Sequence, residues 1–410
     1  MRILPLLTVT VVVAAGAAQA TVTPIGGPTD VSKCPTCGER RPGLAASATQ
    51  FLTAFEAGTP TEPAGVFARL TLANGKPKAK SFLANPPSPF DAERGAVIAA
   101  YSGGFLMAYE SLTPQNNSNV FVRRISNAGA LVGAPILVKT EDLTKPASET
   151  QPSIAAKSDG SFVVAWATTA LAGGTSAPAP PSIEARWFNA AGAPIGTPVK
   201  LNTALVNGGH PVVCIDSTGL AVIAFPTIDE VKPFEPSKQG VAVRRLAATG
   251  AIQGAQVTVA NPLGRQTGVG LSCGLNGSFV VAWASDLAPA TDLGDILFAT
   301  YDKTAKRVGT VAKLPTTNTG TQEAPYLQHD SKGNLIAVWE SESTLGRAIR
   351  GLRIRANGVV DGTDFLVVDK SSVSTRVTHP LLAFFGTTAN FVVTWDEGSR
   401  NVFFRRYKTN

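Results

Sequence analysis

The chain has 410 residues, of which 16% are charged, and it carries 39 glycines, 29 prolines and a formal net charge of +7. An average soluble domain has about a quarter charged residues, so this composition excludes a coiled coil, a helical solenoid and a disordered chain. Beyond the N-terminal region, no apolar stretch reaches the roughly 18 residues that a membrane-spanning helix needs.

The first twenty residues have the pattern of a secretory signal peptide. Arg2 precedes an apolar run over 3–17, and the sequence AQA at 18–20 offers the small residues after which a signal peptidase cleaves. We therefore expect residues 1–20 to be removed and the protein to be secreted or periplasmic.

A motif that ends in an aromatic residue returns along the rest of the chain. Gly160–Trp166 and Gly277–Trp283 share the sequence GSFVVAW, and five further copies keep its pattern. The closing aromatic residues are Phe55, Tyr109, Trp166, Phe225, Trp283, Trp339 and Trp395. Their spacing of 54 to 59 residues indicates an architecture built from seven repeats.

Each unit reads as four strands. The first is expected to begin near a proline such as Pro152 or Pro325, and the aromatic motif forms the second after a tight turn that contains glycine. The third contains arginine, as in Val241–Arg245, and the fourth follows another short turn. Such a meander cannot bury both faces alone. The repeats therefore predict an all-β fold, a seven-bladed β-propeller of four-stranded antiparallel blades over residues 42–410.

The last unit ends after its third strand, so one strand is missing from it. We expect a piece of the N-terminal extension over residues 21–41, from Val22 to Ile25, to pair into this blade as the closing strand of the ring. Closure removes an open sheet edge on which other chains could pair.

The glycine-to-tryptophan motif, followed by an arginine-containing strand and a turn with glycine, resembles the propeller repeats of secreted and surface proteins of bacteria. The resemblance covers residues 42–410 and implies the fold. The chain lacks the S-x-D-x-G-x-T-W box of sialidase propellers, the D-x-D-x-D-G calcium loops of integrin-type blades and the paired Gly-His and Trp-Asp marks of WD repeats. The functions of those families therefore do not transfer to it.

The two faces of the disc are expected to differ. The connections between strands two and three, and between successive units, are long, as at 139–151, 168–182 and 226–239, and should emerge together on what we call the long-loop face. Variable loops on a rigid scaffold are a usual place for binding, so we expect the opposite, tight-turn face to be silent.

Acidic residues follow the closing aromatic residue of several units directly or a few residues later. This position predicts exposed carboxylates at the edge of the long-loop face. Such a ring can bind cations, amines or sugar hydroxyls. Alternatively, each carboxylate caps a strand end or pairs with an arginine of a neighbouring blade. These candidate ligand-binding residues are Glu56, Glu110, Asp229, Asp286, Glu340 and Asp396.

Four further polar residues are expected around one mouth of the central channel. His210 and His379 precede the proline that opens a first strand, and Gln151 and Glu323 stand at or near the same point in their units. Two imidazoles and a carboxylate can ligate a transition metal, but the two histidines belong to units that are not neighbours on the ring. We therefore predict no metal site, and the cofactors, if there are any, stay unknown.

Arginines recur on the third strands, as at Arg123, Arg186 and Arg244. The repeat spreads them around the disc, whereas a nucleic-acid surface gathers basic residues and aromatic rings on one face. We expect no nucleic-acid partner, and we expect these arginines to lie over aromatic rings or to pair between blades.

Four cysteines follow the signal peptide, and four cysteines allow three pairings. Cys214 and Cys273 occupy what the repeat makes equivalent places in the first strands of adjacent units, so we expect a disulfide between them and another between Cys34 and Cys37. The C-x-x-C sequence of the second pair opens no helix, which favours a structural bridge over a redox-active one.

Two functions compete. We favour a monomeric binding or scaffolding module that recognises a glycan, a peptide or a cell-surface partner. The alternative is a glycoside hydrolase or lyase that uses two carboxylates of the long-loop face as acid and base. A catalytic residue should be one that breaks the repeat, and the sequence alone distinguishes no such Glu or Asp, which is why binding leads.

Overall fold

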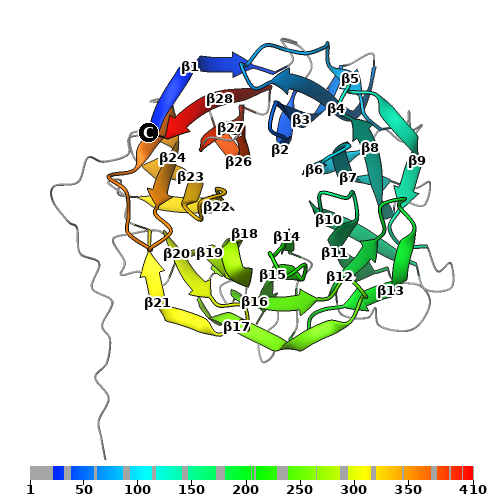
Figure 1. Ribbon diagram of the computed structural model, residues 1–410, viewed down its shortest axis with the longest axis vertical. Coiled ribbons are helices and arrows are strands. Elements are labelled where there is room, and N and C mark those ends of the chain that lie inside the picture. Colours follow the sequence, from blue (N-terminus) through cyan, green and yellow to red (C-terminus); the bar gives the residue numbers. More distant parts are fainter. Residues whose placement is uncertain are drawn as a thin grey trace, which may run out of the picture.

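The structure, a computed structural model, is an all-β propeller of seven four-stranded antiparallel sheets arranged in a ring around a central axis (Figure 1). This confirms the fold predicted from the repeats. The described residues are 22–31, 38–59, 62–85, 93–112, 117–140, 146–171, 181–204, 206, 209–228, 239–264, 266–286, 294–314, 320–343, 346–370, 376–386, 389–398 and 400–409. Within these ranges no helix is long and apolar enough to cross a membrane.

In each blade the strand nearest the channel comes first. Blades one to three consist of β2 (Arg40–Ala46), β3 (Gln50–Thr59), β4 (Glu62–Leu72), β5 (Phe82–Leu83), β6 (Arg94–Tyr101), β7 (Gly104–Leu112), β8 (Ser118–Ser126), β9 (Leu131–Leu137), β10 (Ala147–Ala156), β11 (Phe162–Ala170), β12 (Ser182–Phe188) and β13 (Pro194–Lys200). Blades four and five consist of β14 (Val212–Ile215), β15 (Ala221–Ile228), β16 (Gln239–Leu246), β17 (Ile252–Gly264), β18 (Gln266–Cys273), the short 3₁₀ turn η1 (Leu275–Gly277), β19 (Phe279–Ser285), β20 (Asp295–Tyr301) and β21 (Arg307–Lys313). Blades six and seven consist of β22 (Thr321–His329), β23 (Leu335–Ser343), β24 (Gly346–Ile354), β25 (Phe365–Lys370), β26 (Val377–Phe385), β27 (Asn390–Glu397), β28 (Asn401–Thr409) and β1 (Val22–Asp30).

The ring closes through the two ends of the chain. β1 pairs antiparallel with β28 and supplies the outermost strand of blade seven, with Val22 opposite Thr409 and Ile25 opposite Arg406 (Figure 1). The strand continues beyond Ile25 to Asp30 after an irregularity in the register. Every blade therefore has four strands, and no blade edge is left unpaired by a missing strand.

The closing aromatic residue of each motif packs against the preceding blade, which explains why the motif repeats. Trp283 of blade five lies in one apolar cluster with Val222 and Val241 of blade four, and Trp395 of blade seven lies in another with Ile336 and Ile349 of blade six. The described residues form one such cluster at each of the seven interfaces between blades. Since burying a tryptophan removes a large apolar surface from water, these clusters hold the ring together.

Arginines of the third strands link neighbouring blades, which confirms the role expected for them. Arg186 of blade three donates to the carbonyl oxygen of Val138 in blade two, and Arg406 of blade seven donates to that of Ala73 in blade one. Arg124 lies 5.7 Å from the centre of the Phe162 ring in the next blade. The recurring positive charge thus belongs to the scaffold.

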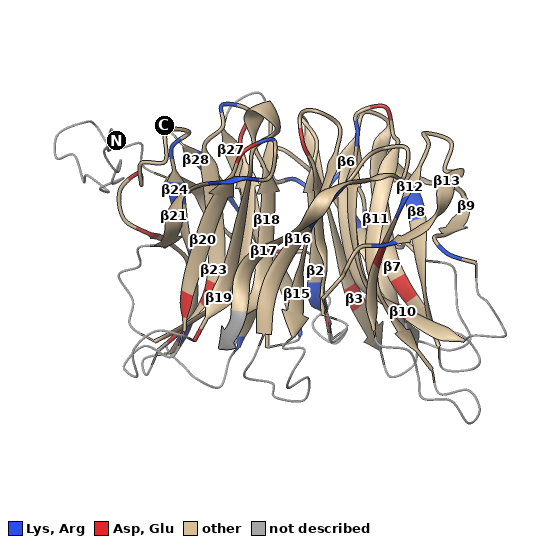
Figure 2. Cartoon of the chain, turned by 90° about the horizontal axis from the view of Figure 1, so that it is seen from below, with Lys and Arg blue, Asp and Glu red and all other residues tan. Residues whose placement is uncertain are grey.

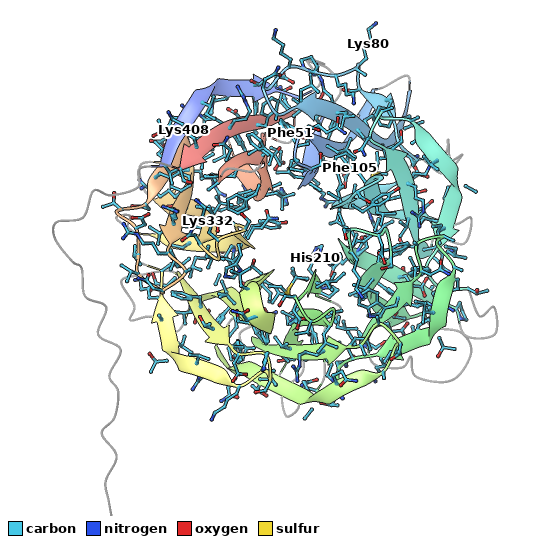
Figure 3. The ribbon with its side chains drawn as sticks, in the orientation of Figure 1. Phe51, Lys80, Phe105, His210, Lys332 and Lys408 are labelled. Atoms are coloured by element: carbon cyan, nitrogen blue, oxygen red, sulfur yellow. A yellow bond between two sulfur atoms is a disulfide. The ribbon has the colours of Figure 1, made fainter. Side chains whose placement is uncertain are left out.

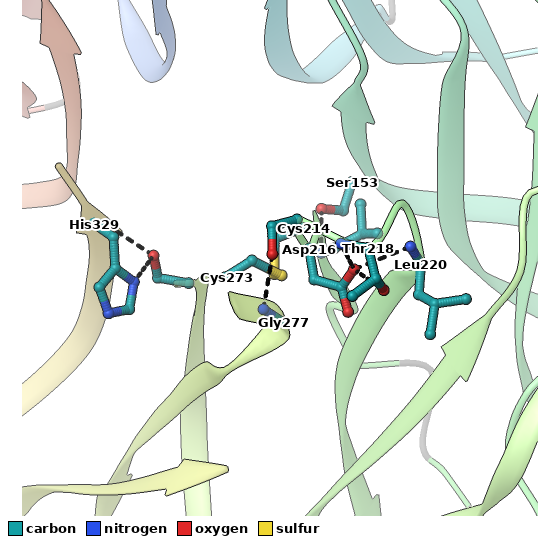
Figure 4. The surroundings of a disulfide bond; sticks show 11 residues. Ser153, Cys214, Asp216, Thr218, Leu220, Cys273, Gly277 and His329 are labelled. Carbon is teal, nitrogen blue, oxygen red and sulfur yellow. Dashed lines mark hydrogen bonds between the residues drawn. A yellow bond between two sulfur atoms is a disulfide. The ribbon is translucent and has the colours of Figure 1, made fainter. Parts of the chain in front are cut away.

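The disulfide between Cys214 and Cys273 is present and joins blades four and five, with 5.7 Å between the Cα atoms (Figure 4). The two positions are not equivalent, however. Cys214 lies opposite Val222 and Cys273 opposite Phe279, which stand three and four residues before the closing aromatic residue of their units. Because side chains alternate between the faces of a sheet, equivalent residues of stacked blades face the same way around the ring. The offset by one residue turns Cys273 back toward Cys214. Cys34 and Cys37 lie outside the described residues.

Candidate functional site

The innermost strands begin earlier than expected and carry a bulge where the prolines stand. In β10, β22 and β26, for example, the register shifts by one residue at the proline, and the residue before it has a positive φ. A bulged residue has no ladder partner, so the missing N–H of proline costs no hydrogen bond there. The bulge residues with positive φ are Arg41, Gly95, Gln151, Gly268, Ala324 and His379.

Carboxylates that directly follow the closing aromatic residue accept a hydrogen bond from the bulge of the next blade. Oε1 of Glu56 accepts a hydrogen bond from the backbone N–H of Gly95 at 2.9 Å, and Oε1 of Glu340 accepts one from that of His379 at 2.8 Å. Glu110 does the same for Gln151. We call these three residues the strut carboxylates. Figure 2 shows acidic residues toward one end of several strands, among them β3 and β7.

The strut carboxylates of blades one and two also pair with an arginine of their own blade. Arg40 lies opposite Glu56 in the sheet with 3.0 Å from Nε to Oε2, and Arg94 lies opposite Glu110 at 2.9 Å. Both glutamates are only 5% exposed. The expectation that they are exposed at the edge of the face is therefore wrong, because the bulge of the next blade and the arginine enclose them.

Blade six breaks this arrangement. Where the first two blades place an arginine opposite the strut, β22 places Glu323 opposite Glu340. Burial raises the pKa of Glu340, and the charges of Glu323 and Asp396 raise it further, against the hydrogen bond and the charge of His379, which lower it. Two carboxylates facing each other with no arginine between them are disfavoured when both are ionised.

A His–Asp pair lies beside this acidic pair, in blade seven. Nδ1 of His379 is 2.8 Å from Oδ1 of Asp396, which also accepts a hydrogen bond from the hydroxyl of Thr378 at 2.9 Å. Asp396 is 1% exposed, whereas about half of the imidazole is open to the channel. Burial opposes protonation, but the hydrogen bond and charge of Asp396, with the charge of Glu340, outweigh it and raise the pKa of His379.

His210 reaches the same channel from blade four (Figure 3). The imidazole of His210 is exposed to solvent. Desolvation by the surrounding protein lowers its pKa, the charge of Glu110 raises it, and the charges of His379 and Arg41 lower it. The two histidines are thus close enough to influence each other across the opening. Among the described residues, no three His, Cys, Asp or Glu side chains are arranged to hold a metal ion.

Two shallow depressions flank the beginning of β22 on the long-loop face. One contains Glu323, Glu340 and Arg347, and the other contains Glu323 and Asp286. Glu323 therefore joins both depressions. Asp229 lies outside the described residues, so its position relative to them is not described.

Arg41 is a channel residue that the sequence analysis missed. It occupies the bulge of blade one, its Nη1 lies 3.4 Å from Oε1 of Glu56, and its charge acts on both channel histidines. The signal was present, because Arg41 precedes Pro42 as His379 precedes Pro380. It was missed because the recurring arginines of the third strands accounted for the basic charge.

Comparison with known proteins shows the fold. No protein-family model matches the chain, and no curated protein matches it. Among solved structures, a protein of unknown function from Dyadobacter fermentans is 10% identical with a TM-score of 0.57, covering 95% of this chain and 99% of its own. An α-L-arabinanase from Penicillium chrysogenum, complexed with arabinobiose, is 12% identical (TM-score 0.52; 95% and 98% covered). The polysaccharide lyase Uly1 is 10% identical (TM-score 0.54; 90% and 89% covered). At these identities the likeness concerns the fold alone.

Proposed function

We propose that this propeller binds a polysaccharide at the long-loop end of its channel and cleaves it by acid–base chemistry on Glu323 and Glu340. The observation that carries the proposal is the position of Glu323 opposite the strut carboxylate of blade six, where blades one and two place an arginine opposite theirs. Of the three blades that carry a strut carboxylate, blade six differs from the other two at this position, as we expect of a catalytic residue, and this difference reverses the earlier preference for a binding module.

The pair has the properties that cleavage of a glycosidic bond requires. Such cleavage needs a carboxylic acid that protonates the leaving oxygen and a second group that acts as base or nucleophile. Glu340 is partly buried and its pKa is raised, so it holds a proton more readily than an ordinary glutamate. Glu323 is exposed and lies in both depressions, where a sugar chain can reach it. Groups whose environments differ in this way divide the acid and base roles between them.

The structural comparisons support a sugar polymer as the substrate class. The arabinanase and the polysaccharide lyase are named for activity on carbohydrates, and both share this fold over nearly the whole chain. The support is an analogy between folds, since one propeller architecture carries many functions.

A glycan-binding module without catalysis is the second candidate. The strut role of Glu340 favours it, because the same hydrogen bond to the next bulge is made by Glu56 and Glu110, which face arginines. In that case Glu340 serves the scaffold, and Glu323 contributes only to recognition of sugar hydroxyls.

One experiment separates the candidates. The purified protein is incubated with arabinan, xylan, polygalacturonate and alginate, and released reducing ends and unsaturated products are measured alongside binding by calorimetry. Cleavage that falls on the order of 100-fold in Glu323→Gln supports the enzyme. Binding of a polysaccharide with no product supports the module. Cleavage that Glu323→Gln leaves unchanged contradicts the assignment of the pair.

We also propose that the protein works outside the cytoplasm. The Cys214–Cys273 disulfide supports this, because disulfides persist in oxidising compartments. The apolar segment over 3–17 followed by small residues at 18–20 gives the export route. Sequencing the N-terminus of exported protein tests the expected cleavage after Ala20.

A further inference from the structure

Two basic side chains stand at neighbouring bulges, and one of them, His379, lies directly beside the Glu323–Glu340 pair. Arg41 occupies the bulge of blade one and His379 that of blade seven, and the strands that carry them, β2 and β26, pack against each other across the closed ring. Their side chains are 50% and 52% exposed. They are therefore accessible to solvent.

Both residues keep a backbone conformation that favours glycine. Their φ angles are +49° and +55°, and at the corresponding bulges of blades two and five the chain places Gly95 and Gly268. Gln151 and Ala324 have the same conformation at two further bulges, so the positive φ is a property of the bulge and does not by itself indicate a function. At two of these bulges, Arg41 and His379 add a basic side chain.

The positive charge of Arg41 is not needed to neutralise Glu56. The carboxylate of Glu56, its nearest acidic group, already accepts hydrogen bonds from Arg40 and from the N–H of Gly95. Arg41 makes one longer contact with it, at 3.4 Å, through Nη1. Its other terminal nitrogen, Nη2, has no hydrogen-bond partner within the described part of the chain.

His379 is held in one orientation. Asp396 engages Nδ1, which leaves Nε2 without a partner among the described residues. The positive charge of Arg41 opposes the charged form of His379, whereas Asp396 and Glu340 favour it. Two like charges close together repel, and an anion bound between them relieves that repulsion.

We propose that Arg41 and His379 bind an anionic group of the sugar chain, a carboxylate or a sulfate ester, so that the substrate is an acidic polysaccharide. The inference rests on the proposed function and specifies its substrate class. Glu340 bonds to the backbone N–H of His379, which places the anion site directly beside the acidic pair. Removal of residues 1–20 takes away one charged residue, Arg2, and leaves a net charge of 7 − 1 = +6, which attracts polyanions to the protein as a whole.

The test measures binding with three defined probes and two variants. Polygalacturonate carries carboxylates, dextran sulfate carries sulfate esters, and dextran carries neither. Arg41→Asn and His379→Asn remove the cations, and asparagine tolerates positive φ better than most residues, so both variants should fold. In His379→Asn the side-chain amide can still donate to Asp396. Circular dichroism and thermal melting check the fold.

We expect the wild-type protein to bind one or both polyanions and to bind dextran at least about tenfold more weakly, with each variant losing about tenfold in affinity for the polyanion. The probe that binds identifies the anionic group. Ala324→Gly serves as the matched control, because it changes a strained bulge that carries no functional group, and its binding should equal that of the wild type.

Equal binding of dextran and the polyanions, or polyanion binding unaffected by either variant, overturns the inference. Cleavage of a neutral polysaccharide with no polyanion binding overturns it while leaving the proposed function intact. Polyanion binding at Arg41 and His379 without cleavage of any polysaccharide supports the site and contradicts the proposed chemistry. The two claims therefore fail separately.

Discussion

Oε1 of Glu110 in blade two accepts a hydrogen bond from the backbone N–H of Gln151 in blade three, at 2.7 Å. Glu110 directly follows the closing aromatic residue of its unit, and Gln151 is a bulge residue that directly precedes a proline. Because the same contact recurs from Glu56 to Gly95 and from Glu340 to His379, it is a repeated joint between blades. A carboxylate ring that looks like a binding site in the sequence is therefore partly a structural device.

Glu110→Ala should destabilise the protein. The substitution leaves the N–H of Gln151 and the guanidinium of Arg94 without their partner at a site where the carboxylate is 5% exposed. We expect the free energy of unfolding to fall by about 2–4 kcal/mol in urea denaturation. Glu323→Ala is the control, since an exposed carboxylate contributes less than about 1 kcal/mol. Equal stability of the two variants contradicts the joint.

Replacing both cysteines of the bridge by alanine should also destabilise the fold. The disulfide links positions separated by 59 residues, and closing a loop of that size stabilises by about 4 kcal/mol in the chain-entropy description. Denaturation of Cys214→Ala/Cys273→Ala under oxidising conditions should show most of this loss. The wild-type protein under reducing conditions should match the variant, and a variant as stable as the oxidised wild type refutes the effect.

Glu39 should make stability depend on pH at the seam of the ring. Its side chain is fully buried, Oε2 accepts the N–H of Val402 at 3.2 Å, and Oε1 has no partner among the described residues. Burial raises its pKa to about 7 from 4.5; the hydrogen bond from Val402 and the charge of Arg69 lower it, while Asp30 raises it. Between pH 4.5 and about 7 the folded protein keeps a proton that the unfolded chain releases, so this contribution to stability is lost as the pH rises.

Glu39→Gln removes the titration while keeping an acceptor for Val402. Relative to the wild type, the free energy of unfolding of this variant should increase by on the order of 3 kcal/mol between acidic pH and about pH 8. Taking the difference between the two proteins cancels the titration of the groups that they share. A difference that does not change with pH rules out a protonated Glu39.

The fold was predictable because each copy of the aromatic motif marks one interface between blades. Trp166, Trp283 and Trp395 each fill an interface with the preceding blade, so the spacing of the aromatic residues counts the blades. The starts of the inner strands were not predictable, because the bulge at His379–Pro380 depends on a carboxylate from another blade. The offset of the two cysteines depends on register, which the repeat defines only to within one residue.

The site was predictable in part. The expected grouping of Gln151, His210, Glu323 and His379 at the channel rests on a shared position in the repeat. To predict that Glu323 lies opposite Glu340, one must know the register of β22 against β23, which cannot be read from the sequence. The structural role of Glu56 and Glu110 was not predictable, because it depends on contacts between strands that are more than 35 residues apart in the chain. Glu56 and Gly95, for example, are 39 residues apart.

The most direct test of the account compares Glu340→Gln with Glu110→Gln on the polysaccharide that the screen identifies. Both residues accept the N–H of the next bulge, and glutamine can still accept it, but only Glu340 faces a second carboxylate. With both variants folded by circular dichroism, we expect Glu340→Gln to lose on the order of 100-fold in kcat/KM and Glu110→Gln to stay within about threefold of the wild type. Full activity of Glu340→Gln, or equal losses in the two variants, would contradict the assignment of the acidic pair as the catalytic centre.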